Sequence, residues 1–340
     1  MMTKRELVLA ALAHRETNPI PFHIELTAQA KENLVAYTAD PHAANKLPSC
    51  LHYMQYWGWP TEVPNRPSYY QDEFGVIWNR SGADKDIGVI ESPLIEDLED
   101  HQYVFPKADI ARLRRDIEHL LATREDQFTF VGFGFCMFER SWSLMGMENV
   151  LTSMVASPEK LEQLYDNICE YFLELVHIAL EYDIDGVYFG DDWGQQKGLI
   201  MGPHLWRKFI KPRMARLYAP VKQRGKVVLQ HSCGDCNEIF PDLIEIGVDC
   251  YQTFQPEVYD IAKMKALYGD KLTFWGGIST QQTLPSMTSD QVRQEILRVM
   301  QVLRPNGGLI IAPAHAVPFD VPPENILAMA EVFQKQERFL

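Results

Sequence analysis

Long apolar segments and an excess of basic residues are both missing from this sequence of 340 residues. No uninterrupted apolar run approaches the roughly 20 residues that a membrane-spanning helix needs. Acidic residues outnumber basic residues by 46 to 32, which gives a formal net charge of -14. Such an acidic surface repels phosphate backbones and anionic lipids, so neither nucleic acid nor a membrane is expected as a partner.

Cysteine is also scarce. The six cysteines are scattered along the chain and do not form the pattern of a disulfide framework. The N-terminus leads into a helical pattern over residues 3 to 13 instead of an apolar signal segment. We found no repeat of fixed period and no low-complexity linker. These features predict a cytoplasmic protein with reduced thiols and one domain over residues 1-340. The oligomeric state stays open, and a homodimer is one candidate.

Short apolar strands alternate with longer amphipathic helices along most of the chain. We predict strands at residues 20–26, 128–134, 186–190, 227–230, 248–251, 272–275 and 308–311, with an eighth candidate near 51–56. This alternation is typical of a parallel sheet, and seven or eight such units favour a closed barrel over an open sheet. The sequence therefore predicts an α/β fold in the form of a (β/α)8 TIM-like barrel with an N-terminal excursion. The predicted excursion is a small hairpin within residues 40–110.

Three candidate metal ligands follow predicted strands. In a barrel of this kind the functional site lies at the C-terminal ends of the strands. His231 and Cys233 are two residues apart where a strand becomes a loop, so their side chains point to the same side. His315, at another strand end, supplies a third donor, and three protein ligands leave the open position of a catalytic zinc site. The alternatives are a buried thiol beside a hydrogen-bonded histidine, or a redox pair of Cys233 and Cys236.

Candidate catalytic acids also follow strands. Asp191 and Asp192 are adjacent carboxylates after a buried strand, and like charges at this distance raise each other's pKa. Either residue is a candidate general acid or base, whereas the structural alternative is a helix N-cap or a salt-bridged loop. Glu139 faces the cavity or forms a plain ion pair with Arg140.

Four further residues are candidate substrate contacts. His23 and Glu25 occupy alternate positions of the first predicted strand, so both point into the barrel, either toward a substrate or as a structural polar layer. Tyr188 lies in a short buried strand, and Gln252 follows another strand. All four would therefore lie near the barrel mouth.

Several segments spread over nearly the whole chain resemble the uroporphyrinogen decarboxylase superfamily. The matching segments are Asp72-Glu-Phe-Gly-Val-Ile-Trp78, Phe138-Glu-Arg-Ser-Trp142 with Gly146-Met-Glu-Asn149, Gly190-Asp-Asp-Trp-Gly194, Phe209-Ile-Lys-Pro-Arg213, His231-Ser-Cys-Gly234, Trp275-Gly-Gly-Ile278, and Asn306-Gly-Gly-Leu-Ile-Ile-Ala-Pro-Ala-His315 with Val321-Pro-Pro-Glu-Asn325. The resemblance implies one of two activities: decarboxylation of uroporphyrinogen without a cofactor, or methyl transfer by zinc enzymes that work with corrinoid proteins.

The sequence departs from the decarboxylases at the segment that follows their first strand. That segment is rich in arginine in the decarboxylases and binds substrate carboxylates, whereas residues 21–29 contain no arginine here. The methyltransferases use a His-x-Cys motif, which matches His231 and Cys233, and a later cysteine, whose position is taken here by His315. One thiolate instead of two leaves the zinc a stronger Lewis acid.

The resemblance therefore favours a zinc-dependent methyltransferase that works with a corrinoid (cobalamin) carried on a separate protein. Its small-molecule methyl donor or acceptor would be a methoxy, methylamine or methylthiol compound. A cofactor-free decarboxylase acting on a different carboxylate is the alternative. A non-catalytic binding protein built on a decayed barrel is the third hypothesis.

Overall fold

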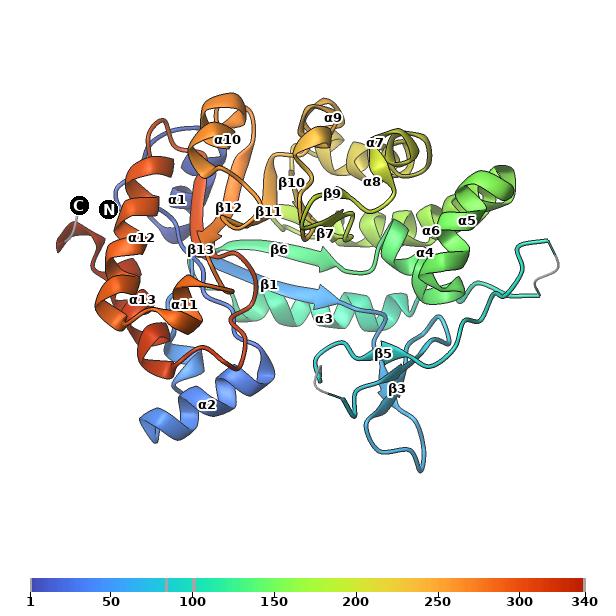
Figure 1. Ribbon diagram of the computed structural model, residues 1–340, viewed down its shortest axis with the longest axis horizontal. Helices are drawn as coiled ribbons and strands as arrows, with labels where there is room; N and C mark the ends of the chain where they lie inside the picture. The colour runs from blue at the N-terminus through green and yellow to red at the C-terminus, as the bar shows by residue number, and fades with distance from the viewer. Residues whose placement is uncertain (1, 83–84, 100–101, 339–340) are drawn as a thin grey trace.

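A curled parallel sheet forms the centre of the molecule in the computed structural model, which describes residues 2–82, 85–99 and 102–338 (Figure 1). The order of its seven strands is β1-β6-β7-β10-β11-β12-β13. These strands are β1 (Leu51–Tyr56), β6 (Phe128–Phe133), β7 (Gly186–Gly190), β10 (Val227–His231), β11 (Cys250–Phe254), β12 (Thr273–Ile278) and β13 (Leu309–Pro313). The predicted TIM-like α/β barrel is confirmed, and the candidate strand near residues 51–56 is β1.

The first predicted strand, at residues 20–26, is not a regular strand, although it occupies the eighth position of the barrel. It forms isolated parallel bridges from Phe22 to Ile311 and from Leu26 to Val317. On its other side, the Cys50 amide donates to the Phe22 carbonyl over 2.8 Å. Pro21 has no N–H to donate, so a continuous ladder cannot form here. The segment therefore closes the barrel between β13 and β1 with few hydrogen bonds.

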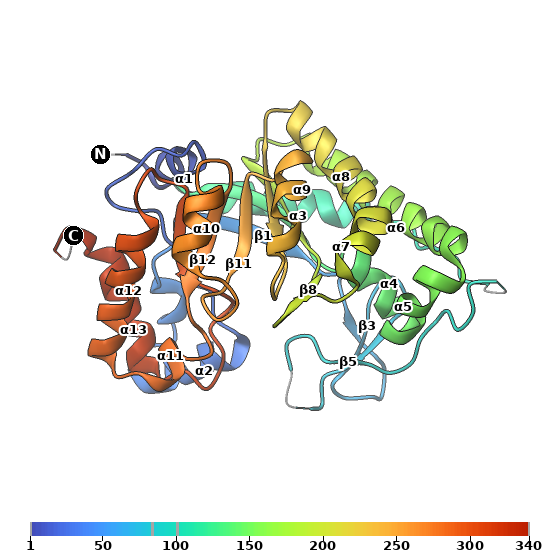
Figure 2. The same cartoon turned by 45° about the horizontal axis from the view of Figure 1, so that its top comes forward.

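Helices surround the sheet (Figures 1 and 2). Helix α3 shows why they pack there: Leu113, Ile117 and Leu120 recur at helical spacing and are buried. The α-helices are α1 (Lys4–Leu12), α2 (Ala28–Thr38), α3 (Ile110–Thr123), α4 (Met137–Met145), α5 (Met147–Ala156), α6 (Pro158–Ala179), α7 (Gly202–Leu205), α8 (Lys211–Gln223), α9 (Phe240–Glu245), α10 (Ile261–Tyr268), α11 (Thr283–Ser286), α12 (Ser289–Leu303) and α13 (Pro323–Gln334). The short 3-10 helices are η1 (Ala44–Lys46), η3 (Asn237–Ile239) and η4 (Gln336–Arg338), and η2 (Trp206–Ile210) is a π-helix. Among the described residues, none of the helices combines the length and the apolar character needed to cross a membrane.

Helix α4 was not predicted from the sequence. Nearly all of its residues are buried, including the polar Glu139, Arg140, Ser141 and Ser143. The helix has only nine residues and its N-cap residue, Cys136, makes no side-chain hydrogen bond to it, so the sequence carries no start signal for it. The helix matters because its first turn lies under the loop that follows β7.

The N-terminal end of the barrel is closed by α1. Val8 of this helix is fully buried and belongs to the apolar cluster inside the barrel, together with Phe130, Tyr188 and Trp275. The Gly308 amide, just before β13, donates to the Ala11 carbonyl over 3.0 Å. Because this end is filled, the opposite end, where the strands finish, is the one available for a ligand.

The excursion is larger than the predicted hairpin. The strands β2 (Thr61–Glu62), β3 (Tyr69–Gln71), β4 (Ile77–Asn79) and β5 (Val89–Ile90) form an antiparallel sheet. Buried Asp72 organises it, because its carboxylate accepts from the amides of Phe74 and Val76. The same carboxylate accepts from Arg140 of α4 over 2.7 Å. The suggested ion pair of Glu139 with Arg140 is therefore wrong, since the partner of Arg140 is Asp72.

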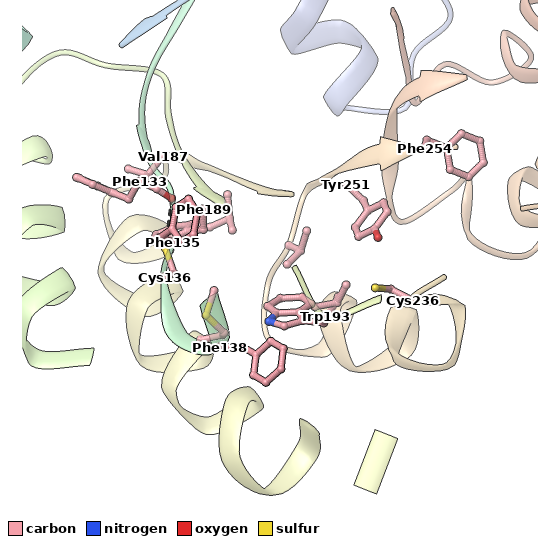
Figure 3. Close-up of a cluster of buried hydrophobic side chains, with 14 of the residues drawn as sticks. Phe133, Phe135, Cys136, Phe138, Val187, Phe189, Trp193, Cys236, Tyr251 and Phe254 are labelled. Atoms are coloured by element: carbon pink, nitrogen blue, oxygen red, sulfur yellow. Dashed lines mark hydrogen bonds between the residues drawn. The ribbon is translucent and has the colours of Figure 1, made fainter. Parts of the chain in front are cut away.

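An apolar cluster lies among the loops that follow β6, β7 and β10 (Figure 3). Phe133, Phe138, Trp193 and Cys236 from these segments are all fully buried. Such dense packing leaves the loops little freedom to move. The cluster therefore fixes the backbone that carries the polar residues described next.

Candidate metal centre

His231, Cys233 and His315 lie together at the C-terminal end of the barrel. Their potential ligand atoms all lie within 4.8 Å of one another. His231 ends β10, Cys233 follows in the loop, and His315 comes after β13. These two strands are not neighbours in the sheet, so only the curl of the barrel brings His315 to the pair.

The spacing of the three residues suits a zinc ion. The distance from His231 Nε2 to Cys233 Sγ is 3.8 Å. Bond lengths of about 2.1 Å to nitrogen and 2.3 Å to sulfur place two ligands of a tetrahedral zinc about 3.5 Å apart. Small side-chain rotations would therefore complete the geometry, and imidazole and thiolate are donors that zinc prefers.

Gly234 holds the loop that carries Cys233 against the strand β8 (Gly194–Gln195). Its φ of +75° is rarely adopted by residues with a side chain. A Cβ atom at this position would also lie 2.3 Å from the carbonyl carbon of Gly194. The loop can approach β8, which pairs with β9 (Gly198–Leu199), only because both facing residues are glycine.

Gln252 of β11 fixes the tautomer of His231. The Gln252 Nε2 group donates to the Ala314 carbonyl over 3.2 Å, which leaves Oε1 facing His231 Nδ1. An amide oxygen only accepts, so Nδ1 carries a proton, and the neutral ring that binds a metal has its lone pair on Nε2, the nitrogen that faces Cys233. Tyr188 donates its hydroxyl to the same oxygen over 3.2 Å. Outer residues of this kind orient the histidine ligands of metal sites.

Asp191 and Asp192 face different surroundings. Asp191 is fully buried and accepts from the amides of Phe138 and Glu139 over 2.9 and 2.8 Å. It therefore binds the first turn of α4 from a distant segment, although the N-cap residue of that helix is Cys136, and burial raises the pKa of Asp191 to about 7.

Asp192 reaches the candidate ligands. Its Oδ1 accepts from the Cys233 amide over 2.7 Å and lies 3.2 Å from His231 Nε2. Burial acts to raise the pKa of Asp192, but the hydrogen bond and charge that His231 supplies in its doubly protonated, metal-free form outweigh it and lower the pKa to about 2. The sequence predicted a raised pKa for both aspartates, but the pKa is raised only for Asp191.

Glu139 is a buried carboxyl group in the first turn of α4. Only 9% of its surface is exposed. Burial, followed by the charges of Asp192 and Asp191, raises the pKa of Glu139 well above its usual value. The carboxyl of Glu139 therefore holds its proton more strongly than an exposed glutamate does, and it lies close enough to Cys233 to act on it electrostatically.

His23 and Tyr188 lie inside the barrel. His23 Nδ1 is 2.8 Å from Ser49 Oγ, and its ring contacts the ring of Trp275 edge-on. Burial lowers the pKa of His23 to about 4, so this residue is neutral. The hydroxyl of Tyr188 is directed to Gln252. Glu25, in contrast, is exposed.

A cavity of about 620 Å³ adjoins the candidate ligands. Cys233 and His315 both line it, so an open coordination position would face this space. Several lining residues were not singled out from the sequence, because no recognisable motif marks them; among them are Gln195 in the short strand β8 and Thr280, Phe319 and Asp320 in loops. The signal for the three loop residues is that they follow the strands β12 and β13.

The fold and the polar residues at the strand ends define an α/β barrel with a candidate mononuclear metal site. Residues 81–336 match the model of the uroporphyrinogen decarboxylase (URO-D) family, and the chain belongs to this family.

One curated relative and one solved structure come from Methanosarcina mazei. The relative, a methylated-thiol–coenzyme M methyltransferase, is 22% identical over 189 residues, which cover 54% of this chain and 47% of the relative. The chain thus matches about half the length of that protein. The solved structure, a methyltransferase, covers 99% of this chain and 100% of its own at 18% identity, with a TM-score of 0.73. That likeness establishes the fold.

Proposed function

We propose that this protein is a zinc-dependent methyltransferase that works with a corrinoid protein. It would transfer a methyl group between a small methylated compound, the corrinoid cobalt and an acceptor. The observation that carries the proposal is the grouping of His231, Cys233 and His315 beside a cavity. The names of both Methanosarcina relatives support the reaction class.

His231, Cys233 and His315 would hold the zinc, whose role when bound is to act as a Lewis acid toward a thiol or a methoxy oxygen of the substrate. Gln252 keeps the lone pair of His231 on Nε2. Asp192 holds the Cys233 amide and so orients the loop that carries the thiol. Because only one of the three ligands is a thiolate, the zinc would keep positive charge, which suits a substrate that binds as an anion through sulfur or oxygen.

The remaining polar residues would handle the substrate and its proton. When a methyl carbon leaves, the bonding electron pair stays on the heteroatom of the substrate, which then takes a proton. We assign this proton to Glu139, the carboxyl whose pKa burial raises, with Asp192 orienting the substrate and Asp191 holding α4 in place. His23, Glu25, Tyr188 and Gln252 remain the proposed residues around the substrate.

Metal analysis of the purified protein tests the proposal first. We expect about one zinc per chain in the wild type and loss of zinc from His231→Ala and Cys233→Ala. The same variants should lose transfer of methyl groups to a reduced corrinoid. Cys236→Ala is the matched control, because this thiol is buried in the apolar cluster and burial raises its pKa to about 12. Methyl transfer that survives chelation and His231→Ala would refute the zinc mechanism, and decarboxylation that is insensitive to chelators would favour the decarboxylase alternative.

A further inference from the structure

The cavity beside the triad of His231, Cys233 and His315 has a lining rich in uncharged polar side chains. Four glutamines and one threonine contribute to it: Gln195, Gln196, Gln255, Gln281 and Thr280. Asp320 also lines the cavity, and among the described lining residues none is lysine or arginine. Proteins usually bind carboxylates and sulfonates through such cations, so this lining favours an uncharged ligand group over an anionic one.

Gln255 is a buried member of this lining, and its amide group has a fixed orientation. The residue follows β11 directly, and only 6% of its surface is exposed. The Gly234 amide donates to Gln255 Oε1 over 2.9 Å, so this oxygen faces the loop that carries Cys233. Gln255 Nε2 has no acceptor among the residues that the structure describes. Because Gln255 lines the cavity, its N–H donors are left for a ligand.

Thr280 supplies a second donor to the same cavity. It lies two residues after β12, the strand that pairs with β11, so Thr280 and Gln255 come from neighbouring strand ends. Only 7% of Thr280 is exposed, and in the described part of the chain its hydroxyl has no hydrogen-bond partner. Buried donors are nearly always paired in folded proteins, so two unpaired donors in one cavity wall indicate an acceptor on the ligand.

We propose that Gln255 and Thr280 form a subsite for an uncharged oxygen acceptor of the substrate, such as a carbonyl, while the atom that carries the methyl group lies at the triad. This inference rests on the proposed function, because the triad is where the reacting atom would bind. Amide and hydroxyl donors match the lone pairs of a carbonyl oxygen. An anionic group at this end of the substrate would meet the charge of Asp320 without a compensating cation from the described lining.

Three thiols of nearly the same shape test the inference, because they differ only at the end distant from sulfur. They are 3-mercaptopropionamide (an uncharged carbonyl), 3-mercaptopropionate (a carboxylate) and 3-methylbutane-1-thiol (no acceptor). Each is titrated into the cobalt(II)-loaded protein, and binding is measured from the visible absorption of the metal. We expect the amide to bind about tenfold or more tightly than the carboxylate, since the lining favours an uncharged group.

Thr280→Val removes the hydroxyl and keeps the shape of the side chain. The affinity for the amide should fall about threefold to tenfold, the effect of one hydrogen bond, while the affinity for 3-methylbutane-1-thiol should change by less than about twofold. Thr280→Ser keeps a hydroxyl and should restore most of the amide affinity. Thr283→Val is the matched control, because Thr283 is a buried threonine of α11 outside the cavity lining. It should bind all three thiols as the wild type does.

Gln255→Glu keeps an oxygen for the Gly234 amide and removes the N–H donors. We expect weaker binding of the amide and a larger loss for the carboxylate, because the added charge repels it. Gln294→Glu adds the same charge at an exposed residue of α12 and should change neither affinity. A loss of amide affinity in one of the two site variants alone supports the subsite at that residue.

Carboxylate binding as tight as amide binding, or amide affinity unchanged in both Thr280→Val and Gln255→Glu, would overturn the inference while leaving the zinc function intact. If no thiol changes the cobalt spectrum, the proposed function fails instead. Ligand-observed NMR with propionamide, which has no thiol, then tests the subsite directly. Propionamide binding that is weakened in Thr280→Val supports the inference, and absent or unchanged binding refutes it.

Discussion

Gln252 is the residue whose substitution should affect metal binding most selectively. It holds His231 through its side-chain oxygen and does not belong to the ligand triad. Gln252→Ala removes the acceptor for Nδ1–H, so we expect zinc affinity to fall by about 10- to 100-fold. Gln252→Glu keeps an acceptor and should retain most of the affinity. Competition with a chromogenic chelator measures both values.

Tyr188→Phe is the control for the Gln252 variants. It removes one hydrogen bond to Gln252 Oε1 but leaves the contact of that oxygen with His231. We expect a smaller loss of zinc affinity than in Gln252→Ala. Equal zinc affinity in the wild type and Gln252→Ala would show that the amide does not orient the ligand.

Glu73 should make stability depend on pH. Burial raises the pKa of Glu73 to about 7, and its carboxylate accepts from the Tyr171 hydroxyl. Between the ordinary glutamate pKa and pH 7, the folded state therefore still binds a proton that the unfolded state has released. The stabilising contribution is full at lower pH and is lost as the pH rises through this range.

Urea unfolding of the wild type and Glu73→Gln from pH 5 to pH 8 measures this contribution. The stability of the wild type relative to the variant should decrease as the pH rises. Glu91→Gln is the comparison variant. Glu91 lies in the same excursion, and its exposed ion pair with Arg66 lowers its pKa. A constant difference between the wild type and Glu73→Gln over this pH range would contradict the prediction.

At the scale of the elements, the contact between α4 and the excursion depends on Arg140 and Asp72. Both side chains are essentially buried, and Arg140 also stacks on Phe74. Arg140→Met leaves the Asp72 carboxylate without its cation, so we expect a loss of about 3–5 kcal/mol in the free energy of unfolding. Urea denaturation provides the measurement.

Arg66→Met is the matched control, because Arg66 pairs with Glu91 on the exposed side of the same excursion. An exposed ion pair contributes about 1 kcal/mol or less. Similar losses in Arg140→Met and Arg66→Met would mean that the buried pair does not anchor the excursion to α4.

The elements also show where sequence patterns are sufficient. Strands β7, β10 and β13 were predicted within a few residues, because each is a short apolar run between helices. Helix α4 was missed because it is short and its N-cap residue, Cys136, gives no side-chain capping signal. The segment of residues 20–26 has a strand-like composition, yet Pro21 prevents the continuous ladder.

At the scale of the whole molecule, zinc should stabilise the fold by joining two distant parts of the chain. A ligand that binds only the folded state stabilises it by about 2.7 kcal/mol when its concentration is 100 times the Kd. Thermal unfolding with and without zinc should therefore show a higher Tm with the metal. His315→Ala should lose most of this increase.

Magnesium is the control for the thermal measurement, since it prefers oxygen ligands and should not raise the Tm through this triad. A zinc-dependent increase in Tm that persists in His231→Ala and His315→Ala would indicate that the metal binds elsewhere.

The sequence by itself determined the order of strands and helices and the presence of donor residues where strands end. Strand periodicity and metal-donor chemistry are local properties, so His231 and Cys233 could be paired from their spacing alone. The barrel fold then implied that the residues at the strand ends share one mouth.

Only the tertiary structure decided which of these residues meet. The curl of the sheet brings His315 to His231 from a strand that is not adjacent to β10. The packing of α4 under the loop after β7 directs Asp191 to helix amides and Asp192 to Cys233, although the two residues are neighbours in the chain. Side-chain direction depends on backbone geometry and on contacts between distant segments, and local sequence patterns do not encode these contacts.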